Sequence, residues 1–107
     1  MAAPGAGAGL AATTTRAREG IWGEALMFPC PCCDYLTLRV PMCWEVCPVC
    51  YWEDDPGARR QPEMPSGPNG ALTLAEARAN YARIGACSPG WIDDVRAPFP
   101  AEPPHSA

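Results

Sequence analysis

The clearest hydrophobic pattern of the chain lies just before Gly85 and predicts a helix. Its apolar positions recur at steps of three, four and three, as on one face of an α-helix: Leu74, Ala77, Tyr81 and Ile84. Thr73 and Glu76 have the spacing of a capping box, in which each side chain accepts a hydrogen bond from an unpaired amide of the first turn. Gly85 is a natural left-handed terminator. We therefore expect one amphipathic helix, with its apolar face on a core.

A second pattern, with the period of a β-strand, precedes the helix. In Tyr35–Val40 the apolar residues alternate, which places Leu36, Leu38 and Val40 on one face. Pro41 ends this strand, and Trp44–Val46 offers a short return strand. The segment 54–69 is rich in proline and is expected to be a long loop. The pattern predicts a small α+β fold, a β-hairpin followed by one C-terminal helix.

The two ends of the chain lack such patterns. Residues 1–20 are rich in alanine and glycine, and residues 98–107 are rich in proline, so neither end can offset the entropy lost on ordering. We expect one domain over residues 21–97 between two disordered segments. The sequence shows no secretory signal pattern and no run of about 18 apolar residues. It therefore predicts a cytoplasmic protein without a membrane span.

Composition narrows the range of functions. The chain has 107 residues, a formal net charge of −4 and one histidine, His105, which lies in the proline-rich tail. A histidine in this position disfavours catalytic triads, Cys-His dyads and histidine-rich metal sites. The negative charge disfavours a nucleic-acid partner. We expect no catalytic residues, and a domain this small usually needs a metal or disulfides to supplement its core.

Cysteine spacing supplies the strongest chemical signal. Cys30 and Cys33 form one C-x-x-C pair, and Cys47 and Cys50 form another across the predicted hairpin. Such a turn lets two thiolates converge on one cation, and two turns supply the four ligands of a tetrahedral site. The residue after each pair often needs a positive φ, which suits Asp34 better than Tyr51. The spacing predicts a metal-stapled, zinc-ribbon-like domain whose two cysteine knuckles bind zinc, with iron as the alternative.

The remaining cysteines leave other arrangements open. Disulfides are the competing interpretation, but seven cysteines is an odd number and adjacent Cys32 and Cys33 are awkward partners. Cys32 is expected to be a bystander that packs beside the site, with exchange for Cys30 or Cys33 as ligand left open. Cys43 and Cys87 are expected to be core fillers or incidental thiols.

The charged residues form one further candidate cluster. Glu53-Asp54-Asp55 is a candidate set of paired carboxylates. Consecutive residues point apart, however, so a solvated turn is favoured in which an aspartate caps local amides. Polar residues on the predicted helix are candidates to grip these acids and pin the helix to the knuckle: Arg78, Asn80 and Arg83.

Three motifs in the same order resemble the cysteine-rich CPCC family of small bacterial proteins. They are the segments that start at Cys30, at Val46 and at Leu74, and the resemblance spans about residues 28–98. The family usually has glycine where this chain has Asp34. The resemblance implies a cysteine-rich, metal-binding domain and no established activity.

These observations favour a non-enzymatic zinc-binding domain that acts as an interaction or accessory module for an unknown protein partner. The runner-up is a rubredoxin-like carrier, in which the same four thiolates hold a single iron. The third candidate is thiol–disulfide exchange through Cys47 and Cys50. That chemistry needs the first cysteine at a helix N-terminus, and Pro56 lies too close behind for a good helix.

Overall fold

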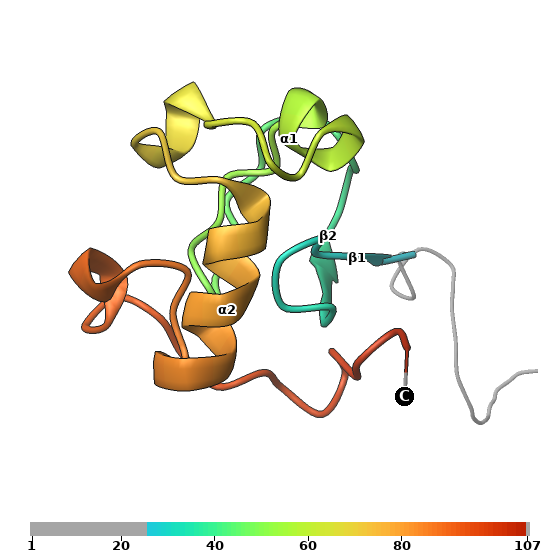
Figure 1. The fold of residues 1–107 in the computed structure, drawn as a ribbon. Helices are drawn as coiled ribbons and strands as arrows, with labels where there is room; N and C mark the ends of the chain where they lie inside the picture. Colours follow the sequence, from blue (N-terminus) through green and yellow to red (C-terminus); the bar gives the residue numbers. More distant parts are fainter. Residues whose placement is uncertain (1–25, 107) are drawn as a thin grey trace, which may run out of the picture.

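The computed structural model describes residues 26–106 (Figure 1), so the disorder expected for residues 1–20 lies outside the described chain. Two short strands and two α-helices form a small α+β fold. In chain order the elements are β1 (Phe28–Pro29), β2 (Leu36–Leu38), α1 (Pro56–Arg60), the 3-10 helix η1 (Gly67–Asn69), α2 (Leu74–Ile84) and the 3-10 helix η2 (Pro89–Trp91). Within residues 26–106, every helix is too short or too polar to span a bilayer.

Helix α2 confirms the predicted helix and its cap. Thr73 Oγ1 accepts a hydrogen bond from Glu76 N at 3.0 Å, and Glu76 Oε1 accepts one from Thr73 N at 3.0 Å. Gly85 ends the helix with φ 77°. Leu74 and Ala77 are buried, and they pack with the cysteines and with the largest core side chains: Trp52, Leu38 and Val49.

The predicted pairing of the hairpin is wrong. β2 pairs antiparallel with β1, and Val46 instead forms a bridge with Glu53. Each C-x-x-C turn therefore closes a small hairpin of its own, because the chain reverses at the turn between its cysteines. The strand is also shorter than expected. It ends at Leu38, and the next amide, Arg39 N, donates to Glu45 Oε1 at 2.8 Å in place of a strand partner.

The segment expected to be a long loop contains α1 and η1. Asp55 Oδ1 accepts a hydrogen bond from Gly57 N at 2.9 Å and so caps α1, whose first residue is Pro56. An aspartate before a proline at the first helical position is a helix start. Pro56, which was expected to prevent a helix, is therefore the residue that begins α1.

Asp54 is fully buried, where a solvated turn was expected. Its carboxylate accepts hydrogen bonds from Arg59 Nε at 2.8 Å and from Met42 N at 2.6 Å. Arg59 also donates to Pro29 O at 3.3 Å, so the ion pair ties α1 to β1. The arginine that grips the acids is therefore in α1 and not in α2.

The proline-rich tail has defined contacts up to Ser106, in place of the disorder expected for residues 98–107. Pro103 O accepts a hydrogen bond from Leu36 N at 3.1 Å, and His105 N donates to Asp34 O at 2.8 Å. Prolines lack amide donors but keep their carbonyl acceptors, so the tail can still pair with an edge. Figure 1 shows the tail returning to the side that carries β1 and β2.

An ion pair holds this tail at its start. The two nitrogens of the Arg96 guanidinium donate to Glu102 Oε1 at 2.8 Å and Oε2 at 2.9 Å. Hydrogen bonding from Arg96 lowers the pKa of Glu102. A carboxylate with a lowered folded pKa adds stability above its ordinary pKa of 4.5, and that stability is lost as the pH falls through the folded value.

We expect Glu102→Gln to weaken the attachment of the tail by about 1 kcal/mol, because a partly buried, bidentate ion pair contributes a stability of this order. Hydrogen exchange of the His105 amide measures it. Protection in the wild type should decline in acid below pH 4.5, and the variant should show low protection with little pH dependence. Equal protection in both proteins at neutral pH would contradict the role of the pair.

Candidate metal centre

Two equivalent turns present the four cysteines. In the first, Asp34 N donates to Cys30 O at 2.8 Å and Cys30 N to Tyr35 O at 3.0 Å. In the second, Tyr51 N donates to Cys47 O at 2.7 Å, and Cys47 N donates to the carbonyl of the residue after Tyr51 at 3.0 Å. The same local bonding brings two sulfurs of each turn to one side of the backbone.

The residue after each pair has the positive φ that the sequence predicts. Asp34 has φ 73° and Tyr51 has φ 70°, a region that glycine enters more easily. Asp34 is held there by side-chain contacts with the tail, because its carboxylate accepts hydrogen bonds from Ser106 N at 2.8 Å and Ser106 Oγ at 3.2 Å.

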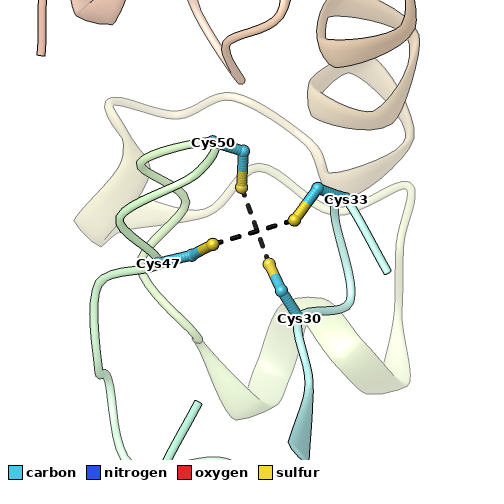
Figure 2. Close-up of side chains that lie close together, drawn as sticks. All are labelled: Cys30, Cys33, Cys47 and Cys50. Carbon is cyan, nitrogen blue, oxygen red and sulfur yellow. Dashed lines mark hydrogen bonds between the residues drawn. The ribbon is translucent and has the colours of Figure 1, made fainter. Parts of the chain in front are cut away.

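The four sulfurs meet in one buried cluster (Figure 2). All four lie within 4.8 Å of one another. Cys30 Sγ is 3.6 Å from Cys50 Sγ, and Cys33 Sγ is 3.7 Å from Cys47 Sγ. These are the four cysteines that the spacing selects, and the structure brings them together.

The cluster has the dimensions of a tetrathiolate metal site. A tetrahedron with metal–sulfur bonds of about 2.3 Å has edges of about 3.8 Å. The sulfur–sulfur distances of 3.6 and 3.7 Å belong to opposite edges and are close to this value. The four thiols are therefore compatible with metal binding, and they could hold zinc or a single iron.

Crowding of the sulfurs shifts their proton affinities in opposite directions. Hydrogen bonds to its sulfur, first from Cys30, lower the pKa of Cys47. The pKa of Cys50 is raised, first by its hydrogen bond with Cys30. One thiolate is thus favoured at the expense of its neighbours, whereas a bound cation favours the thiolate form of all four. Metal affinity should fall in acid, since protons compete for the sulfurs.

Contacts around the cluster orient its sulfurs and join them to the helix. Thr37 Oγ1 lies 3.0 Å from Cys47 Sγ, and Val49 N donates to the same sulfur at 3.4 Å. Arg78 of α2 donates to Pro31 O, inside the first turn, at 2.8 Å. Such outer contacts hold metal ligands in place. Arg78 does pin the helix to a knuckle, but through a carbonyl and not through the acidic cluster.

The other two residues predicted to grip the acids have different partners. Asn80 Nδ2 donates to Cys87 O at 2.9 Å, and the Arg83 guanidinium donates to Asn80 Oδ1 at 3.2 Å. That prediction is wrong for both residues. Threonine at position 37 was not identified from the sequence, and the only available signal was a hydroxyl on the strand next to the first turn.

The remaining cysteines lie outside the group of four. Cys32 and Cys87 are buried in the core, and Cys43 is exposed. Desolvation by burial, with a smaller contribution from charge repulsion by Cys32 and Cys47, raises the pKa of Cys87 to about 12. Cys87 is thus a core thiol, and Cys43 is not a core filler.

Cys32→Ala should keep the full metal content and lose at most about 1 kcal/mol of stability, because only a small buried side chain is truncated. Metal analysis of purified Cys32→Ala and Cys33→Ala measures the difference. Loss of metal from the first variant and retention in the second would make Cys32 the ligand instead.

Comparison with known proteins finds a family match over the region that contains the cysteine cluster. A family model described as Cysteine-rich CPCC matches residues 28–102, which include both turns, α2 and the start of the tail. No curated protein matches the chain.

Proposed function

Because this chain belongs to the cysteine-rich CPCC family, we propose that it is a small zinc-binding module whose metal has a structural role. Cys30, Cys33, Cys47 and Cys50 would be the ligands. Zinc supplies no redox chemistry at such a site and acts by holding the two turns together. The fold would then be zinc-ribbon-like, with two knuckles that meet at the metal.

Burial of the cluster carries this proposal. Cys47 and Cys50 are fully buried, and the exposure of Cys30 and Cys33 is 1% and 8%. Four sulfurs complete a tetrahedral shell, so no position stays open for a water or a substrate. A closed shell is typical of structural sites, whereas catalytic zinc keeps an open position.

A bound metal also supplies what this small core lacks. The hydrophobic core contains few large side chains, and four of its residues are the cysteines of the cluster. Binding free energy at a site that exists only in the folded chain is also folding free energy. We therefore propose a non-enzymatic role as an interaction or accessory module, in which the metal would serve to hold the shape of the domain. We place this module in the cytoplasm, where thiols stay reduced.

A single iron is the alternative occupant. The same closed shell of four thiolates suits a rubredoxin-like electron carrier, and the Val49 amide that donates to Cys47 Sγ at 3.4 Å is a contact that tunes iron–sulfur potentials. Thiol–disulfide exchange has less support. The described chain has no helix that starts at Cys47, so no helix dipole activates this thiol.

Metal analysis of protein purified under reducing conditions, without added metal, tests the proposal. We expect one zinc per chain and no absorption in the visible range. A coloured protein with one iron per chain would support the electron carrier. Protein that folds without any metal would refute both.

A further inference from the structure

A pocket of about 570 Å³ lies beside the second cysteine turn and takes no part in the metal cluster. Its walls come from the turn itself, from the region of η1 and from η2. The residues that matter here are Tyr51, Glu53, Leu72 and Trp91. Together they offer two aromatic rings, an apolar surface and one carboxylate.

The two aromatic residues stack against each other at this pocket. The ring centroids of Tyr51 and Trp91 are 5.0 Å apart, and the ring planes are inclined by 35°. Trp91 keeps 44% of its surface exposed, although it belongs to a short, ordered 3-10 helix. Tyr51 has φ 70°, a strained conformation for an aromatic residue. The second knuckle thus carries an aromatic ring where glycine would relieve strain.

Hydrogen bonds to the backbone fix the walls of this pocket. Cys87 N donates to Cys50 O at 2.8 Å and ties the segment before η2 to the second turn. The Asn69 side chain accepts from Glu53 N at 2.8 Å and donates to Glu53 O at 2.9 Å. The backbone amide and the backbone carbonyl of Glu53 are therefore both paired with Asn69. Among residues 26–106, no hydrogen-bond donor or cation contacts the Glu53 carboxylate.

We propose that this pocket binds an arginine side chain of a basic partner peptide. A planar guanidinium stacks on aromatic faces and forms two parallel hydrogen bonds with a carboxylate. The stacked pair of Tyr51 and Trp91 lines the pocket and supplies its aromatic surface, and Glu53, which lines the same pocket, supplies the carboxylate. An anion would be repelled by Glu53, and an apolar ligand would bury that charge without a partner. The net charge of −4 also attracts a basic partner.

This inference rests on the proposed interaction module and identifies the class of its partner. The probe is a blocked tripeptide with arginine between two glycines, titrated into the full, metal-loaded chain and followed through the indole N–H signals in NMR spectra. We expect the signal of Trp91 to shift on titration. The same peptide with citrulline, which is planar but neutral, should bind at least about tenfold more weakly.

Two variants and two matched controls locate the binding. Glu53→Gln and Trp91→Ala should each weaken arginine binding about tenfold. Glu63→Gln changes an exposed carboxylate away from the pocket, and Trp44→Ala removes another exposed tryptophan, so both should leave the affinity unchanged. The absence of binding at millimolar peptide, equal binding of the citrulline peptide, or equal losses in the controls would overturn the proposal.

The metal content of each sample separates the two proposals. Wild-type protein that contains zinc but does not bind the arginine peptide would refute the pocket and leave the zinc module intact. Wild-type protein that folds and binds the peptide without zinc would refute the structural metal and support the pocket.

Discussion

Cys47→Ser is expected to leave the domain unfolded under conditions in which the wild type is folded. The cysteine is fully buried, and its sulfur contacts Cys33 Sγ at 3.7 Å and Thr37 Oγ1 at 3.0 Å. With zinc bound as proposed, loss of one ligand would remove most of the metal-binding free energy, which is on the order of 10 kcal/mol for structural zinc. Natural domains have only about 5–15 kcal/mol of stability in total. Circular dichroism and metal analysis of the purified variant measure the effect.

Cys43→Ser is the matched control for this variant. The Cys43 side chain is exposed and lies outside the cluster, so the same replacement should retain both the metal and the fold. A Cys47→Ser protein that folds with native secondary structure and no metal would show that the core is sufficient without the cluster.

Arg59→Met should destabilise the metal-loaded protein by about 3 kcal/mol, because it leaves a buried carboxylate without its cation. Asp54 is fully buried, whereas the Arg59 side chain is 23% exposed. Methionine keeps an unbranched apolar stem but is shorter than arginine and lacks the guanidinium. The remaining donor to Asp54, Met42 N at 2.6 Å, compensates only part of the charge. Urea unfolding of both proteins gives the difference in free energy.

Arg60→Met provides the control, since this arginine is adjacent, exposed and in the same helix. Its replacement should change the free energy of unfolding by less than about 0.5 kcal/mol. Equal losses of unfolding free energy in the two variants would mean that α1 is destabilised by any replacement of an arginine, and not by loss of the ion pair.

The helix and the cysteine cluster could be predicted because their signals are local. A capping box and an apolar stripe occupy one continuous segment and define α2. The pairs Cys30–Cys33 and Cys47–Cys50 each lie in a single turn, so spacing alone brings their sulfurs together. The positive φ of Asp34 and Tyr51 follows from the same turn geometry.

The strand pairing and the acidic cluster could not be predicted because they depend on contacts across the chain. A period of two shows which residues share a face, but it does not show which strand lies alongside, and β2 pairs with β1 across the first turn. Likewise, three consecutive acidic residues are typical of a solvated turn, and only the folded chain brings Arg59 to Asp54. The contacts of the tail have the same cause, since Leu36 meets Pro103 only in the folded chain.

The docking of the tail has a consequence for the order of folding. Asp34 and Ser106, which join the tail to the first turn, are 72 residues apart in sequence, whereas Cys30 and Cys50 are 20 apart. Closing the longer loop costs about 1 kcal/mol more in chain entropy. During synthesis, both turns also leave the ribosome before the tail. We expect the cluster to assemble first and the tail to dock after the rate-limiting step, so the contacts of Glu102 should slow unfolding without speeding folding.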